Sequence, residues 1–280
     1  MLPLSFELAL DIQDFRRTLA EMFEAGTPGD EVRGYIASEL YLDERGVESL
    51  FNYFRDQHRF ALIPHRHRVL IEYYQEGEKS WVVFHTLFGR RVNDVLSRAV
   101  AWLVARREDR DVELSLTDHG FYVAYEGQVK IMDAFNLLQT RDLRETMEDA
   151  LRDSEILKRR FRHCATRSLM ILRAYGGRRK SVGTQQMRSL ILQYVIERMD
   201  EYFPILREAY REVLEDAMDI RSAARVIEEI KSGKIQIEAQ VVKAPSPFAF
   251  HILMQGRMDL VKVEDRQAFL QRMHAQLTEG

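Results

Sequence analysis

Hydrophobic residues recur every three or four positions in the first fifth of the chain, as on one face of a helix. Between residues 5 and 60 this stripe includes Leu8, Ile12, Phe15, Leu19 and Met22. A Gly-Thr-Pro-Gly-Asp break at 26–30 separates two helices, and Asp43 stands where an N-cap would begin a third that ends before Pro64. We therefore expect a helical unit over residues 1–64.

The hydrophobic pattern then alternates with the period of two that is typical of strands. The four segments with this pattern are 69–74, 81–88, 112–116 and 121–125. A Gln-Glu-Gly-Glu turn joins the first two, and a helical stretch follows Gly89 before the third. The pattern predicts an antiparallel sheet with one packed helix over residues 65–140.

The remaining chain is mostly of helical period up to Gly233, with breaks at Gly176-Gly177, Pro204 and Asp219. Residues 235–242 alternate as a strand, and the proline-rich stretch 245–248 is typical of a rigid elbow before a charged terminal helix. We expect an α+β fold. Its second half is predicted as a basic helical bundle over 141–233 and a strand, elbow and helix over 234–280.

Composition places the chain among ordinary globular proteins, with 46% hydrophobic and 30% charged residues. The single cysteine, Cys164, excludes an intrachain disulfide and a thiolate metal cluster. The first residues lack the basic segment of a signal peptide, and no apolar run approaches about 18 residues. These features predict a cytoplasmic protein without a membrane partner.

Charge is distributed unevenly, although the formal net charge is only −3. The window 151–190 holds eleven Lys or Arg against two acidic residues, so it carries about +9 and the rest of the chain about −12. Such an asymmetry is expected where one segment meets an anionic partner.

Known catalytic motifs are absent from the sequence. The stretch 176–181 ends in Lys-Ser but lacks the strand and the glycine spacing of a phosphate-binding loop. HExxH, CxxC and GxSxG do not occur, and the pair His65 and His67 is too small a set for a metal site. We predict no catalytic centre and no metal, and we interpret Asp118-His119 as turn chemistry.

The first candidate for phosphate contact is the turn that follows the second predicted strand. It brings Arg90, Arg91 and Asn93 to the start of a helix. Guanidinium groups, backbone donors and the helix dipole would meet there, which suits a phosphate. The alternative is that the arginines are solvated or pair with Asp94, and the sequence does not decide between the two.

The second candidate is the basic helix and loop, in which arginines alternate with apolar residues so that one helix face stays free. The nucleic-acid-binding residues predicted here are Arg159, Arg160, Arg167, Arg178, Arg179, Lys180, Gln185, Gln186 and Arg188. Arg162 belongs to the same helix pattern. The alternative is a solvated face, or one that docks on an acidic protein.

The third candidate is Pro245-Ser246-Pro247-Phe248-Ala249-Phe250, where aromatic rings follow a rigid element. Stacking on a base would contribute about 1 to 3 kcal/mol per base. Phenylalanines in such a setting more often belong to a core, and the core interpretation is favoured.

Three segments carry a resemblance to a known family, at residues 82–103, 155–189 and 229–253. They resemble the Lhr (large helicase-related) superfamily 2 DNA helicases, particularly archaeal members. The resemblance implies the DEAD/H-associated region that follows the RecA-like motor lobes and winged helix. It also implies that Met1 begins either a shortened form or one half of a split gene.

The same resemblance implies a role for the region in the helicase. It would clamp the strand during ATP-driven 3′ to 5′ unwinding, with single-stranded or forked DNA and the motor lobes as partners. An RNA–DNA hybrid remains an open alternative as a partner. ATP and Mg are expected only in the motor lobes, and no cofactor in this chain.

Two other functions remain open from the sequence. A DNA glycosylase that flips a base would use a carboxylate, for which we would inspect Asp118, Asp133 and Asp142. A protein-docking assembly module would place the basic face on an acidic protein and touch no nucleic acid.

Overall fold

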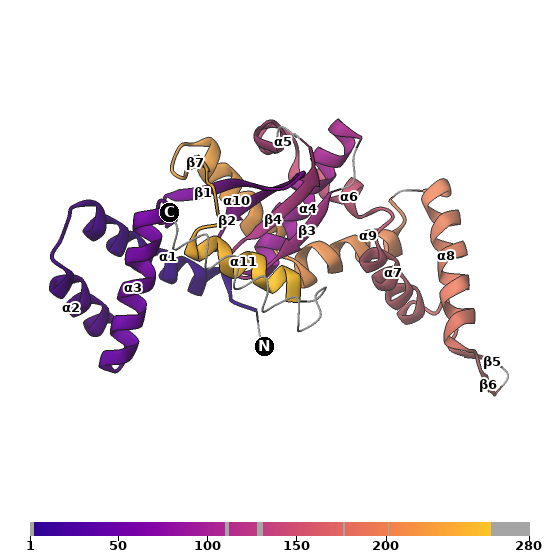
Figure 1. Ribbon diagram of the computed structural model, residues 1–280. Coiled ribbons are helices and arrows are strands. Elements are labelled where there is room, and N and C mark those ends of the chain that lie inside the picture. Colours follow the sequence, from indigo (N-terminus) through magenta and orange to yellow (C-terminus); the bar gives the residue numbers. More distant parts are fainter. Residues whose placement is uncertain (1–2, 110–111, 128–130, 176, 201, 259–280) are drawn as a thin grey trace.

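The computed structural model describes residues 3–109, 112–127, 131–175, 177–200 and 202–258. The molecule is elongated, with a unit of three helices at one end, a sheet in the middle and a helical limb at the other end (Figure 1). This arrangement confirms the α+β class.

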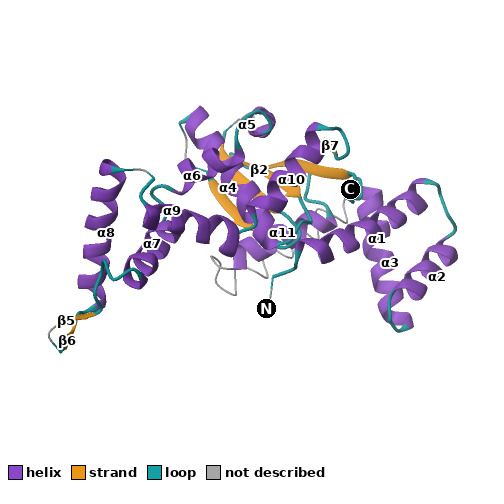
Figure 2. Cartoon of the chain, turned by 180° about the vertical axis from the view of Figure 1, so that it is seen from behind, coloured by secondary structure: helices purple, strands orange, loops and turns teal. Residues whose placement is uncertain are grey.

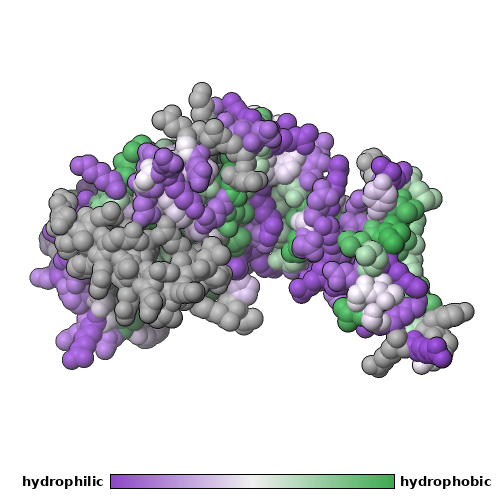
Figure 3. Space-filling view, turned by 45° about the vertical axis from the view of Figure 1, so that its right-hand side comes forward, coloured by the Kyte–Doolittle hydropathy of each residue, from purple (hydrophilic) through white to green (hydrophobic). Residues whose placement is uncertain are grey.

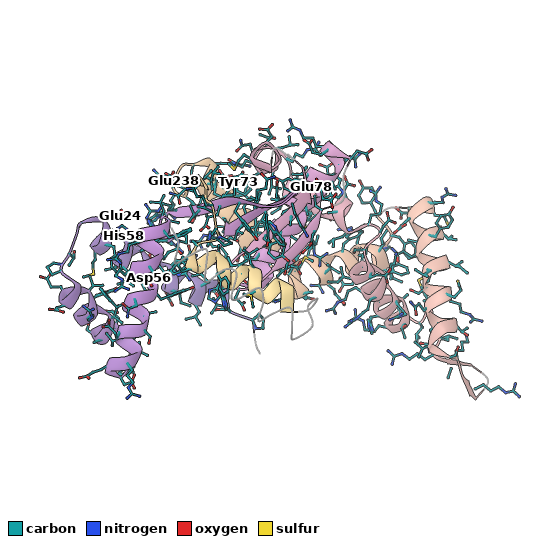
Figure 4. All side chains as sticks on the ribbon, in the orientation of Figure 1. Glu24, Asp56, His58, Tyr73, Glu78 and Glu238 are labelled. Atoms are coloured by element: carbon teal, nitrogen blue, oxygen red, sulfur yellow. The ribbon has the colours of Figure 1, made fainter. Side chains whose placement is uncertain are left out.

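The helical unit consists of α1 (Phe6–Glu24), α2 (Gly29–Glu39) and α3 (Glu44–Phe60). The side chain of Asp43 accepts a hydrogen bond from the amide of Gly46, which confirms the predicted N-cap. Leu19, Ile36 and Phe54 lie in the small core between the helices. Glu24 and His58 lie near the ends of α1 and α3 (Figure 4), where Glu24 forms an ion pair of 2.6 Å with Arg68 at the start of the sheet.

The sheet has five strands in the order β3-β4-β2-β1-β7. They are β1 (Arg68–Glu76), β2 (Lys79–His85), β3 (Glu113–Leu116), β4 (Phe121–Glu126) and β7 (Gln236–Val241). The first four pair antiparallel, as predicted, but β7 pairs parallel with β1. The sheet is mixed because α10 (Ile220–Lys231) leads the chain back to the end at which β1 begins.

Helices cover both faces of this sheet. α4 (Arg90–Glu108) and α10 lie on one face (Figure 2), next to the short helices α5 (Ile131–Leu138) and α6 (Leu143–Leu151). Ile71, Phe84 and Val123 point to this side, whereas Trp81 and Tyr122 point to the other. The central strands are therefore almost wholly buried.

The second sheet face is covered by α11 (Pro247–Met258), which begins inside the stretch that the sequence predicts to be an extended elbow. Proline suits the first turn of a helix, and the hydroxyl of Ser246 accepts a hydrogen bond from the amide of Ala249. The predicted charged terminal helix falls in residues 259–280, outside the described residues.

The limb contains α7 (Glu155–Arg167), α8 (Val182–Met199), α9 (Pro204–Arg211) and the π-helical segment η1 (Glu212–Ala217). Between α7 and α8 the chain forms a two-stranded hairpin, β5 (Ala174–Tyr175) and β6 (Arg178–Arg179), where the sequence predicts only a loop. This hairpin lies at the tip of the limb (Figure 1). No helix in the described part of the chain is both long and apolar enough to cross a membrane.

Candidate nucleic-acid interface

The basic helix α7 packs one face on the core and leaves the other free. Leu157, Phe161 and Ala165 are fully buried, whereas Arg159 is exposed. Ser154 caps the helix by accepting a hydrogen bond from the amide of Leu157. The alternation of arginine and apolar residues therefore gives the two-sided helix that the sequence predicts.

α8 lies against α7 with an unusual distribution of side chains. Its buried side carries Ser189, Gln193 and Ile196. Its exposed side is more apolar, with Met187, Ile191, Tyr194, Val195 and Met199 each between 42% and 79% exposed. The limb shows apolar surface in the space-filling view (Figure 3).

A groove of about 560 Å³ runs between α7 and α8. The lining residues from α7 are Glu155, Ile156, Lys158, Arg159, Arg160 and Arg162, and those from α8 are Val182, Gln186, Ser189 and Leu190. The hydroxyl of Ser189, a residue only 3% exposed, has no hydrogen-bond partner among the described residues. Basic groups and an unsatisfied hydroxyl thus converge on one groove, and a phosphate oxygen would satisfy both.

The electrostatic character of this groove is positive. Lys158 is paired with Glu155 at 3.0 Å, but Arg159 and Arg162 form no ion pair within the described residues. Burial lowers the pKa of the nearby His163, and Arg162 and Arg159 lower it further because they repel the protonated ring.

Two of the predicted arginines are engaged by a carboxylate. Glu212, which is 5% exposed, forms ion pairs with Arg167 and, at 3.5 Å, with Arg160. These ion pairs connect α7 to η1. Arg160 lines the groove all the same, whereas Arg167 is not among its lining residues.

The hairpin brings further basic residues to the tip of the limb. Arg178 is exposed and Lys180 is partly buried, while the side chain of Arg179 lies outside the described structure. Gln185 donates to the carbonyl of Lys180 at 3.0 Å, so its amide group is engaged within the chain. Gln186 lines the groove, and Arg188 is exposed on the same helix.

The predicted cluster at the start of α4 is separate from this groove. The guanidinium of Arg91 donates to the carbonyls of Glu215 (2.8 Å) and Met218 (2.8 Å), and so holds the end of η1. Asn93 is fully buried and donates to the carbonyl of Thr117 at 2.9 Å. Only Arg90 presents an exposed side chain, so the structure does not bring the three together as a phosphate site.

The carboxylates considered for a glycosylase all have structural partners. Asp118 accepts from the amides of Leu4 (2.9 Å) and Arg90 (3.0 Å). Asp133 pairs with Arg107 at 3.2 Å, and Asp142 caps α6. None of the three lines the α7–α8 groove or a second pocket, which lies between the helical unit and the sheet.

The proline-rich stretch and the metal-ligand residue types complete the comparison with the sequence. Phe248 is 3% exposed and belongs to the core of the helical unit, as the core interpretation predicts, whereas Phe250 is partly exposed and lines the second pocket. The described residues contain no group of three or more His, Cys, Asp or Glu placed to hold a metal ion. Ser189 also lines the groove, but the sequence analysis does not identify it. A single serine within a helical pattern does not indicate which residues of other helices lie beside it.

A known family model matches most of the chain. The family model described as DEAD/H associated matches residues 63–249. The chain belongs to this family.

Relatives of this DEAD/H associated chain match it over nearly its whole length. The ATP-dependent helicase Lhr-Core of Methanothermobacter thermautotrophicus is 50% identical over 98% of the chain and 32% of the relative. The Lhr-Core helicase of Sulfolobus acidocaldarius is 37% identical over 100% of the chain and 32% of its own length. The chain thus spans about a third of the length of these curated relatives.

The fold also matches a solved structure. The helicase Lhr of Mycobacterium smegmatis, in its complex with ssDNA and AMP-PNP, aligns with a TM-score of 0.74 and 22% identity. The alignment covers 90% of this chain and 32% of that protein. The DEAD/H associated chain therefore shares its fold with part of a helicase.

Proposed function

We propose that this chain is the DNA-guiding accessory part of an ATP-dependent 3′ to 5′ DNA helicase. The observation that carries the proposal is the α7–α8 groove, where unpaired arginines and the unsatisfied hydroxyl of Ser189 converge. In this proposal the groove holds the phosphates of a single strand or fork, so the chain contributes position and not base recognition.

The motor belongs to other parts of the helicase in this proposal. The relatives are named ATP-dependent helicases and are about three times as long as this chain. The sequence has no loop that could surround a triphosphate. In this proposal ATP and Mg bind to the RecA-like motor lobes, which are the proposed protein partner.

A salt titration tests the groove directly. Replacing Arg159 and Arg162 with alanine should reduce the slope of log affinity against log salt by about 1.5, because each lost phosphate contact removes about 0.7 to 0.9. Affinity should fall equally for all sequences. Fluorescence anisotropy with single-stranded, forked and RNA–DNA hybrid probes measures the slope and ranks the partners.

Two further variants complete this experiment. The matched control replaces Arg45 and Arg59, two exposed arginines of the helical unit, and should leave the slope unchanged. Replacing Arg178, Arg179 and Lys180 tests the hairpin, with an expected loss of about 2 to 3 in slope. If the Arg159 and Arg162 variant keeps the parental slope while circular dichroism shows it folded, the groove does not bind DNA.

A second candidate function is protein docking, favoured by the apolar side of α8. Met187, Ile191 and Tyr194 are each more than half exposed and lie on the same helix. A group of exposed apolar side chains of this kind is typical of a protein-interaction surface. An unchanged salt slope in the groove variant would favour this function, with the motor lobes as the partner.

A further inference from the structure

A second pocket, of about 600 Å³, lies far from the basic limb, between the helical unit and the sheet. Five segments meet there: α1, α3, the end of β2, the β3–β4 turn and α11. In Figure 1, α11 lies in front of the sheet beside this helical unit. Its lining includes Arg16, Tyr53, His85, His119, Phe250 and His251.

Arg16 is the central group of this pocket. Its guanidinium lies 4.7 Å from the centre of the Phe248 ring and forms no ion pair or hydrogen bond within the described residues. Burial lowers the pKa of Arg16 to about 10. A partly buried cation without a counter-ion is costly, so an anion entering the pocket would be bound favourably.

Two histidines stand beside this arginine. The rings of His119 and His251 meet edge to face with centres 5.0 Å apart. Nδ1 of His119 is buried without a partner in the described structure. Burial and, to a lesser extent, the charge of Arg16 together lower the pKa of His119 to about 4, so the ring is neutral near pH 7.

A buried polar network fixes the third histidine. Nε2 of His85 lies 2.8 Å from a carboxylate oxygen of Glu72, and Glu72 is fully buried. The same carboxylate also accepts hydrogen bonds from the amide and the hydroxyl of Ser246. Burial alone would raise the pKa of Glu72, but His85 and Ser246 outweigh it and lower the pKa. The Glu72 carboxylate is thus already hydrogen-bonded to His85 and Ser246. The Asp118 carboxylate is likewise hydrogen-bonded to two backbone amides.

The rest of the lining is apolar and aromatic. Phe248, Phe250 and the ring of Tyr53 form walls around the cation, and the hydroxyl of Tyr53 donates to the carbonyl of Pro247 at 3.4 Å. A largely apolar cavity of this size with a few convergent polar groups is typical of a small-molecule site. A flat ring that carries a negative group matches this lining better than a bare anion does.

We propose that this pocket binds one nucleotide, with its phosphate on Arg16 and His119 and its base against the aromatic wall. The nucleotide is either free or one unit of a nucleic-acid strand. The phosphate gains charge-assisted hydrogen bonds from the guanidinium, and a stacked base needs no particular identity. The site is independent of the α7–α8 groove.

Calorimetry with the 280-residue chain tests the pocket, with dAMP as the probe. Adenosine and inorganic phosphate should each bind at least about tenfold more weakly than dAMP, because each lacks one half of the interaction. Arg16→Gln should weaken dAMP binding by at least about tenfold. Arg17→Gln is the matched control, since Arg17 lies one position along α1 and contacts His67 and Glu21 instead.

Histidine NMR provides a readout that does not depend on a folded variant. In the parent protein, dAMP should shift the ring signals of His119 and His251 and leave those of His163 unchanged. Adding an eight-residue oligo(dA) distinguishes the sources. If the oligonucleotide displaces dAMP, the pocket binds one nucleotide of a strand. If the oligonucleotide leaves bound dAMP in place, the pocket binds a free nucleotide.

Two outcomes would overturn the proposal. Phosphate that binds as tightly as dAMP would remove the role of the base, and equal dAMP affinity of the Arg16→Gln and Arg17→Gln variants would remove the role of the pocket. The Arg159 and Arg162 variant separates the two proposals, because it should bind dAMP like the parent even if the groove contacts no DNA.

Discussion

Gly89 joins the end of β2 to the start of α4 in a backbone conformation that only glycine adopts easily. Its φ is +83° and its ψ 155°, and a Cβ placed there would lie 2.5 Å from the carbonyl oxygen of Leu4. The N-terminal segment therefore passes directly over this residue. The sequence shows a glycine at a turn, but the contact with Leu4 comes from the tertiary structure.

Gly89→Ala should destabilise the protein by about 2 kcal/mol, through backbone strain and the clash with Leu4. Urea unfolding followed by circular dichroism measures the loss. Gly34→Ala is the control, because Gly34 lies inside α2 and a Cβ there meets nothing within 4 Å. That variant should gain about 0.5 to 1 kcal/mol, and a Gly89→Ala variant as stable as the parent would contradict the prediction.

Individual side chains also show why a motif alone misassigns them. Arg91 and Asn93 suit phosphate chemistry by type, yet both are used to bind carbonyls inside the protein. The same donor groups can bind a phosphate or an unpaired carbonyl, so type and spacing do not separate the two roles.

At the scale of elements, one carboxylate of η1 pairs with two arginines of α7, beside the apolar packing of the two segments. Glu212 pairs with Arg160 and Arg167 and lies almost completely buried between the two segments. Both pairs connect the two segments of the limb, and the pair with Arg160 also withdraws positive charge from the groove.

Glu212→Gln should lower the free energy of unfolding by about 2 kcal/mol, less than for a fully buried pair because both arginines are partly exposed. The same variant should bind single-stranded DNA more tightly and with a steeper salt slope, because Arg160 and Arg167 are released. Glu208→Gln, which breaks an exposed pair with Arg211, should change stability by less than about 1 kcal/mol. Weaker DNA binding by a folded Glu212→Gln variant would contradict this account.

At the scale of the whole molecule, the described residues place the α7–α8 groove and the Arg16 pocket apart, on a chain whose sequence has no motor motif. Purified alone, it should show no ATP hydrolysis stimulated by nucleic acid, because none of its motifs can hold a triphosphate with its magnesium ion. A phosphate-release assay with and without single-stranded DNA measures this. A blank purification from cells without the protein is the control, and stimulated turnover above that blank would refute the prediction.

The sequence determined most of the elements, because their signals are local. Period, caps and turns predict α1 to α4 and the four antiparallel strands, and the Asp43 cap is confirmed in atomic detail. The uneven charge also pointed to the limb that contains the groove. These features depend on residues a few positions apart, so local chemistry is enough to reveal them.

The tertiary structure alone decided which distant groups meet. The parallel pairing of β7 with β1, the burial of Asn93 and the pocket around Arg16 each join segments far apart in the sequence. Whether a basic side chain is free depends on the carbonyls and carboxylates that packing places beside it. For that reason Arg159 and Arg16 remain unpaired within the described structure while Arg91 and Arg167 are bound.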